Sequence, residues 1–504
     1  MSVPTELARD DHWQRLDPRM LLVHPVRELI RFLPVLVGVF VAGTASGGGS
    51  DWWHLAGVGV PVGLGLLRYL TTSFRIAGGR VELRRGLLNR HVLSTPLDRV
   101  RTVDLTSSPI HRLLGLTTVR VGTGTSSTDG DDRLDLDGLP LDRARSLREG
   151  LLGAATPAPT GGATPDTGTA GLAPVTPAER VVVRLDPSWL RFAPLTSSGL
   201  VIAAAAIGAT SQVVQALGGW ESVDVSGIVD GTSALPLWVA LPLGLVTFVV
   251  VVSLFSVGGY LVTSWGFTLS HAAGAWHLRR GLLTTRETSL DDERVGGISI
   301  GEPLGLRTAG GARLTAIVTG LDRKQQGSSL LVPPAPYDVV AGVARTVLGV
   351  AGPVDAELTG HGPQARTRRF VRALVPALAV VVAVLLLVVL RDWPWWLLVP
   401  ALVLPVAALA LAADRARGLG HALVDGYVVS RSGSLDRRRR ALATDDVIGW
   451  NFRATWFQRR AGLTTLVATT AGGDQRVAVL DIPEDAAVRL AETALPHLVG
   501  QFTA

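Results

Sequence analysis

Six apolar runs, arranged as three close pairs, limit what this chain can fold into more than any other feature of its sequence. A helix needs about 20 apolar residues to cross a bilayer, and the mean hydropathy of +0.34 agrees with several such spans. Because the connector inside each pair is short, each pair returns to the side on which it began. The predicted spans are residues 32–46, 52–68, 197–217, 235–257, 371–390 and 393–413. The first pair is short and rich in glycine, which leaves a shallow or re-entrant hairpin open there.

Arginine marks one side of these hairpins. Basic residues near spans stay on the cytoplasmic side. The tips of the first two hairpins carry only acidic charges, such as Asp51 and Glu221, and the third tip has one arginine, Arg391. The arginines at the open ends are Arg27, Arg31, Arg68, Arg75, Arg80, Arg180, Arg184, Arg191, Arg366, Arg368, Arg369 and Arg372. We therefore expect a multi-pass protein of the cell membrane with both termini cytoplasmic.

An internal repeat follows the three hairpins. Gly86–Val100 aligns without a gap with Gly281–Val295 and with Gly433–Val447. Apolar and polar residues alternate inside each copy, as in half-buried strands. A proline followed by an aspartate then opens a helical pattern, at Pro140, Pro336 and Pro483. Each copy is thus predicted to be a run of short strands closed by one helix.

The alignment of the first and last copies continues without a gap, so that Arg112 and Gly115 fall on Arg459 and Gly462. The middle copy fits this segment only if about five residues are dropped, which places Gly305 there and leaves it without the arginine. We therefore predict that Gly86, Gly281 and Gly433 share one turn. We also predict that Gly115, Gly305 and Gly462 share another.

These motifs resemble a known family. The paired spans, the R-R-G-L-L turn at residues 84–88 and 279–283, the P-L-D-R-V segment at 96–100 and the R-x-x-G-L signature at 112–116 resemble the membrane-anchored bacterial pleckstrin-homology (PH) domain. Three such domains with three hairpins look like the YdbT-type membrane proteins. The resemblance implies a seven-stranded bent β-sandwich or partial barrel, capped by a helix, that binds a partner and catalyses no reaction. It also implies a smaller membrane protein with a single PH domain as a partner.

The expected fold is therefore a multi-pass α-helical membrane protein with six spans and three cytoplasmic PH-like domains. The predicted segments are an N-terminal segment (1–31), hairpin 1 (32–68), PH-like domain 1 (69–152), a flexible linker (153–179), an amphipathic entry and hairpin 2 (180–257), PH-like domain 2 (258–350), a linker (351–370), hairpin 3 (371–413) and PH-like domain 3 (418–504).

Arginines at one hairpin of each copy are the candidate contacts for lipid or for a partner. They are Arg84, Arg85, Arg90, Arg279, Arg280, Arg286, Arg437, Arg438, Arg439 and Arg440. Guanidinium groups near the cytoplasmic leaflet attract phosphate head groups. The alternative is a solvated hairpin that only satisfies the positive-inside rule. Four consecutive arginines on a strand place two side chains on each face, and an unpaired buried guanidinium is costly, so at least one face must be open or paired.

No catalytic, metal or cofactor site is expected. The chain has no cysteine, which excludes disulfides, thiolate nucleophiles and cysteine-ligated metals. The acidic clusters near Asp131 and Asp292 lack EF-hand spacing. The net charge of +6 suits nucleic acid or an anionic membrane surface. Because membrane spans are present, we expect the lipid bilayer as the partner and no nucleic acid.

Three classes of function remain open from the sequence. The first is a non-enzymatic scaffold whose cytoplasmic domains bind one another, a partner protein or anionic phospholipid head groups. The second is a role in envelope defence or export. The third is transport of lipid or a small solute through the six-helix bundle, which ionisable residues within the spans would favour.

The predicted topology is tested by single cysteines at Ser226, in the second hairpin tip, and Ser432, in the last repeat. A membrane-impermeant thiol reagent applied to intact cells should label S226C only, because the other position faces the cytoplasm. Labelling of both positions from outside contradicts the topology.

Overall fold

A computed structural model describes the fold. It covers residues 13–23, 25–27, 59, 62–63, 66–67, 69–77, 80–85, 91–96, 102–122, 134–153, 179–196, 198–216, 236–318, 329–470 and 476–499. The chain forms two compact units that meet in sequence between Asp291 and Asp292. The predicted first hairpin lies almost wholly outside the described residues, as do the hairpin tip at Ser226 and the turn at Gly86.

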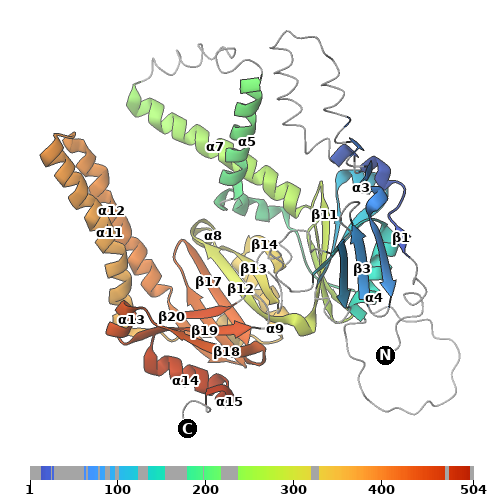
Figure 1. The fold of residues 1–504 in the computed structure, drawn as a ribbon. Coiled ribbons are helices and arrows are strands. Elements are labelled where there is room, and N and C mark those ends of the chain that lie inside the picture. Colours follow the sequence, from blue (N-terminus) through green and yellow to red (C-terminus); the bar gives the residue numbers. More distant parts are fainter. Residues whose placement is uncertain are drawn as a thin grey trace. The chain divides into compact units, whose positions relative to one another are not determined.

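All three repeats have one element order (Figure 1), in which three strands precede a second set of three strands and a closing helix. The first repeat comprises β2 (Ser73–Ala77), β3 (Arg80–Arg85), β4 (His91–Pro96), β5 (Thr102–Ser107), β6 (Leu116–Gly122), β7 (Leu134–Pro140) and α4 (Leu141–Gly153). The middle repeat comprises β9 (Thr268–Ala272), β10 (Ala275–Arg280), β11 (Thr285–Asp291), β12 (Val295–Pro303), β13 (Gly311–Val318), β14 (Leu330–Pro336) and α9 (Tyr337–Leu348). The last repeat comprises β15 (Gly420–Val424), β16 (Tyr427–Ser432), β17 (Asp436–Ala443), β18 (Val447–Arg453), β19 (Leu463–Thr470), β20 (Val477–Pro483) and α14 (Glu484–Ala494).

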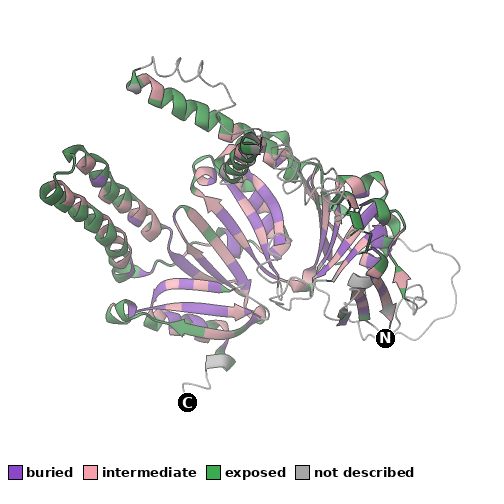
Figure 2. Cartoon of the chain, turned by 45° about the horizontal axis from the view of Figure 1, so that its top comes forward, coloured by how far each residue is buried: buried purple, intermediate pink, exposed green. Residues whose placement is uncertain are grey.

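Alternating apolar residues of these strands form the cores that the closing helices cover. In the first repeat, Val81, Val119 and Leu136 are buried together with Ala144 of α4. In the last repeat, Leu466, Val479 and Ile482 pack against Ala487 and Ala491 of α14. Figure 2 shows this burial as purple along the strands. The predicted run of strands closed by a helix is therefore confirmed for the first and last repeats.

The sheets continue from one repeat into the next. In the first unit the strand order is β7-β6-β5-β11-β10-β9-β8, where β8 is Arg180–Arg184. In the second unit it is β14-β13-β12-β17-β16-β15. Two antiparallel joints, β5 with β11 and β12 with β17, thus link consecutive repeats through backbone hydrogen bonds. Strands β1 (Gln14–Arg15) to β4 form a further sheet, as do β18 to β20.

Two of the three glycines predicted to share the first turn do so. Gly281 has φ +110° and Gly433 has φ +102°. At each position a Cβ would collide with the carbonyl oxygen of the third residue after it, Thr284 or Asp436. Only glycine tolerates this conformation without strain, so the equivalence of these two turns is confirmed.

The prediction for Gly305 is wrong. Gly305 lies inside the helix α8 (Leu304–Thr308), and the turn before β13 belongs to Gly310, with φ +73°. Gly115 and Gly462 have φ +70° and +62° in the corresponding turns. No residues need be dropped, because Gly310 follows Gly281 at the spacing that separates Gly86 from Gly115. The error arose because the L-G-L tripeptide at 304–306 has the same sequence as residues 114–116, the end of the R-x-x-G-L signature in the first repeat.

The corrected alignment gives the middle repeat its signature arginine, Arg307. It lies in α8, as Arg112 lies in α3 (Pro109–Leu113) and Arg459 in α13 (Trp456–Arg460). Arg112 Nη1 donates to the carbonyl of Leu282 at 2.7 Å, and Arg307 Nη1 donates to the carbonyl of Ser434 at 3.2 Å. Leu282 and Ser434 each directly follow the turn glycine of the next repeat. The signature arginine therefore clamps the hairpin of the repeat that follows.

Three helices in the described part are long and apolar enough to cross a membrane: Trp238–Ser264, Gly362–Arg391 and Trp395–Arg417. They belong to α7 (Leu237–Ser264), α11 (Gly362–Arg391) and the pair formed by η8 (Trp395–Leu397) and α12 (Leu398–Arg417). Their large apolar side chains are exposed, green along α11 and α12 in Figure 2. The predicted span 197–217 coincides with the helix α5 (Ser198–Ala216).

The base of α11 is fastened to strand β20 by polar contacts. Asp481 is 2% exposed. It accepts a hydrogen bond from Arg368 Nε at 3.0 Å, and Arg369 Nη2 lies 2.7 Å from its other oxygen. His361, which precedes α11, donates from Nδ1 to the carbonyl of Leu480 at 2.8 Å. Its ring lies 5.0 Å from that of His421.

This attachment predicts a dependence of stability on pH. Burial, reinforced by the neighbouring His421, lowers the pKa of His361 to about 4. Below the ordinary pKa of 6.5 the unfolded chain binds this proton first, so the stabilisation present at neutral pH is lost as the pH falls from 6.5 towards 4. At pH 5 the expected loss is about 2 kcal/mol. Thermal unfolding of the full-length protein should lose more stability between pH 7.5 and 5 than that of H361N, which cannot be protonated. Equal losses contradict the assignment.

Candidate functional site

Strand β17 carries the four consecutive arginines, and its alternation divides them between two faces. The strand pairs with β16 on one side and β12 on the other, so it lies in the interior of the sheet. Successive side chains of a strand point to opposite faces. Arg437 and Arg439 lie on one face, and Arg438 and Arg440 lie on the other. The two faces have different partners.

Arg437 and Arg439 are held by structural contacts. Arg437 Nη2 donates to Asp414 Oδ1, near the end of α12, at 2.8 Å. Arg439 donates to the carbonyls of Pro353 and Ala356 at 2.9 and 2.8 Å. Burial lowers the pKa of both guanidinium groups, although arginine remains charged in proteins. This pair therefore anchors the strand.

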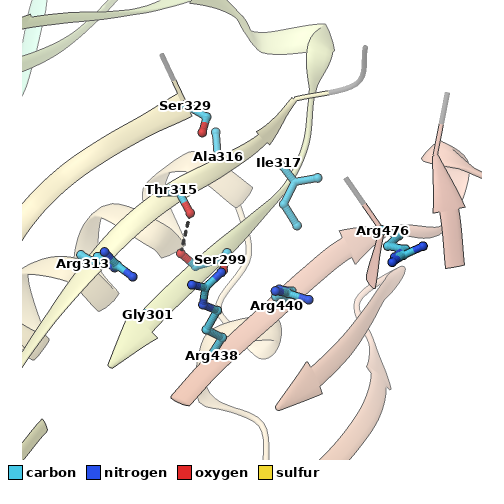
Figure 3. A pocket seen from close by; sticks show the side chains of 10 residues that line it. All are labelled: Ser299, Gly301, Arg313, Thr315, Ala316, Ile317, Ser329, Arg438, Arg440 and Arg476. Atoms are coloured by element: carbon cyan, nitrogen blue, oxygen red, sulfur yellow. Dashed lines mark hydrogen bonds between the residues drawn. The ribbon is translucent and has the colours of Figure 1, made fainter. Parts of the chain in front are cut away.

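Arg438 and Arg440 face a pocket of about 540 Å³ (Figure 3). Two further arginines line it: Arg313 comes from β13, and Arg476 directly precedes β20. The other lining residues are Ser299, Gly301, Thr315, Ala316, Ile317 and Ser329. Figure 3 shows the four arginine side chains in a row, from Arg313 past Arg438 and Arg440 to Arg476. The pocket thus combines residues of the middle and last repeats.

The register of the joint sets the spacing of these groups. Ser299 lies opposite Arg440, and Gly301 lies opposite Arg438. Gly301 also lies opposite Arg313 on the other side of β12. A Cβ on Gly301 would come within 3.0 Å of Arg313 Nε. The glycine therefore leaves room for the Arg313 side chain over the sheet.

The pocket has an excess of positive charge. Asp436 accepts two hydrogen bonds from Arg438, at 2.9 and 2.6 Å, and lies 3.6 Å from Arg313. Within the parts of the chain that the structure describes, the Arg440 side chain makes no hydrogen bond or ion pair, although the charge of Asp436 acts on it. Burial, and then the charge of Arg438, lowers the pKa of Arg440. Four guanidinium groups beside one carboxylate suit an anion with several oxygens, such as a phosphate, which arginine binds bidentately.

The other predicted arginines do not form a comparable cluster. The Arg84 guanidinium lies 5.7 Å from the centre of the Trp13 ring. Arg85 ends β3, and Arg90 lies outside the described residues. Arg279 is 3.5 Å from Glu287, and Arg280 lies opposite Arg286 in the β10–β11 hairpin. Burial lowers the pKa of Arg280.

Sequence reasoning missed Arg313 and Arg476. Arg313 is more than 120 residues from β17 in the chain, and only the β12–β17 joint brings the two together. The alternation in the segment G-A-R-L-T at 311–315 marks Arg313 as a strand residue of one face. Nothing in the sequence pattern indicates which strand lies beside it.

Comparison with protein families matches the bacterial PH domain twice, at residues 28–155 and at residues 370–494. No curated protein and no solved structure gives a match. Each matched segment contains the six strands and closing helix of one repeat, together with the sequence of the predicted hairpin before it, 32–68 or 371–413. The two matches cover just over half of the chain, which therefore belongs to the bacterial PH domain family.

Proposed function

We propose that this protein is a non-enzymatic membrane scaffold that binds anionic phospholipid head groups at the cytoplasmic face through its arginine-lined pocket. The single observation that carries this proposal is the gathering of Arg313, Arg438, Arg440 and Arg476 around one pocket. Domains of this family are generally non-catalytic, which favours binding over chemistry.

The middle repeat serves as a third PH-like domain in this proposal. Its support is the shared order of strands and helix, together with the R-x-x-G signature at Arg307–Gly310. Six spans with both termini cytoplasmic complete the proposed layout. The arginine asymmetry of the sequence and the helices α7, α11 and α12 support it.

Strand β17, which contributes Arg438 and Arg440 to the pocket, is hydrogen-bonded through Arg437 to the proposed membrane helix α12. Arg437 and Arg307 both contact Asp414, at 2.8 and 3.0 Å, three residues before α12 ends. Arg438 directly follows Arg437 on β17. Basic residues close to the cytoplasmic leaflet gain about 1 kcal/mol each from anionic lipids. The attachment to α12 keeps the pocket-bearing strand near that leaflet.

The site requires two repeats. Arg313 and Ser299 belong to the middle repeat, whereas the other three arginines belong to the last one. The last repeat alone, residues 418–504, would therefore lack one wall of the pocket. Binding experiments need the full chain.

The double substitution R438Q/R440Q tests the pocket. Isothermal titration of the full-length protein in neutral detergent with a soluble short-chain phosphatidic acid should show at least about tenfold weaker binding, because each charge-assisted hydrogen bond contributes about 1.5–3 kcal/mol. Raising the salt concentration should also weaken the binding of the unmodified protein. A short-chain phosphatidylcholine should bind poorly throughout, because its net charge is zero.

The matched control is R437Q/R439Q, which removes the same charges from the opposite face of the same strand. This variant should keep its affinity and lose thermal stability, since its arginines make structural bonds. Equal weakening in both variants would mean that net charge, and not the pocket, attracts the lipid. Unchanged binding in both removes lipid recognition from this site.

A further inference from the structure

The two joints between repeats are built in the same register. Leu290 lies opposite Thr102 in the first joint, and Leu442 lies opposite Gly297 in the second. Leu290 and Leu442 occupy equivalent positions, nine residues after the turn glycines Gly281 and Gly433. Thr102 and Gly297 also occupy equivalent sequence positions, 16 residues after Gly86 and Gly281. One pairing geometry is therefore used twice.

Each joint uses the third strand of one repeat and the fourth strand of the repeat before it. Among the described residues, no strand of another repeat pairs with the third strand of the first repeat, β4, or with the fourth strand of the last repeat, β18. Both lie at the edge of their sheets in the described part of the chain. Exposed edge strands present unpaired backbone groups that other strands can pair with. Strands β4 and β18 thus correspond to the two complementary halves of the same joint.

Each edge exposes a large apolar side chain, and the one on β18 is buried at the equivalent positions of the other repeats. Leu105 of β5 and Ile300 of β12 are 2% and 1% exposed, whereas Phe452, at the same position of β18, is 44% exposed. On β4, Val92 is 55% exposed. The register of the two joints places Phe452 directly opposite Val92. Two uncovered apolar side chains would therefore cover each other.

The signature arginine gives a second, independent indication that the last repeat can pair with another repeat. Arg112 and Arg307 each bind the hairpin of the following repeat across a joint. Arg459 is the third member of this set, and it is exposed. Its side chain has no hydrogen bond or ion pair among the residues that can be described. Arg459 is therefore available to bind a hairpin of another molecule.

We propose that β18 of one molecule pairs antiparallel with β4 of a second copy of this chain, in the register of the two internal joints. Phe452 then lies opposite Val92, and Trp450 lies opposite Ser94. The indole Nε1 of Trp450 is buried without an acceptor in the described structure, and the Ser94 hydroxyl supplies one nearby. Arg459 then reaches the second copy across the joint, as Arg112 and Arg307 reach the repeat that follows them. Such head-to-tail contacts join different surfaces, so they generate rings or open rows of copies.

Cysteine cross-linking tests the register, because the natural chain has no cysteine. Full-length V92C and F452C chains, carrying different tags, are mixed in detergent and oxidised. Directly opposed strand residues lie within reach of a disulfide, so a mixed dimer should form. The control pair is L93C with F452C. It should cross-link at least about tenfold less, because neighbouring residues of a strand point to opposite faces.

The arginine clamp is tested in the same assay. R459A should slow formation of the mixed dimer by about tenfold, which corresponds to one charge-assisted hydrogen bond. R460A, which changes the neighbouring arginine that lies over the Trp456 ring, should leave it unchanged. The side chains of Arg459 and Arg460 are both exposed. Thermal unfolding like that of the natural chain shows that each variant folds.

Three results overturn the proposal. The first is the absence of a mixed dimer between V92C and F452C chains. The second is a disulfide that forms only within a chain carrying both cysteines, which indicates closure of one molecule on itself. The third is capture of β18 by a different protein with a single such repeat while copies of this chain do not cross-link.

Discussion

Backbone pairing between repeats is the constraint on which the rest of this structure depends. A sheet edge exposes a row of unpaired donors and acceptors, and here β5 and β12 satisfy that row by pairing with β11 and β17 of the next repeat. The pairing fixes which residues face each other across the joint. It also explains why the signature arginine lies in the short helix before the turn, since from there its side chain reaches the neighbouring hairpin.

The arginine pocket is a product of this joint. Arg438 and Arg440 reach one face of the sheet because β17 alternates, and Arg313 lies near them because β12 separates β13 from β17 by one strand. On the other face, the hydrogen bonds of Arg437 and Arg439 offset the cost of burying their guanidinium groups. A run of four like charges is thus accommodated in an interior strand: Arg437 and Arg439 are bonded on one face, and Arg438 and Arg440 line the pocket on the other.

Much of this fold could be predicted from the sequence, because it depends on local patterns. Apolar runs indicated the spans that became α7, α11 and α12, and the alternation and turn glycines indicated the strands. The division of the arginine run between two faces followed from the period of a strand. The error at Gly305 arose because a short L-G-L motif outweighed a constant spacing that Gly310 preserves.

The pairing of strands from different repeats could not be predicted, because backbone hydrogen bonds leave little trace in side-chain patterns. For the same reason Arg313 and Arg476 were missed, since they join the site only through tertiary structure. The contact that Arg112 makes with the next repeat could not be predicted from the sequence either. Its partner is the carbonyl of Leu282, and a carbonyl belongs to every residue type.

The attachment of α11 has a consequence for the behaviour of the protein in bilayers of different thickness. With 30 residues, the helix is about 45 Å long, and a hydrocarbon layer is about 30 Å thick. If α11 spans the bilayer, roughly ten of its residues stand outside the hydrocarbon layer, among them Arg368 and Arg369, which hold Asp481. A helix fixed so firmly at its base cannot tilt by itself when the membrane thins. In that case the sheet that contains Asp481, formed by β18 to β20, changes its angle to the membrane together with the helix, which couples bilayer thickness to the orientation of this sheet.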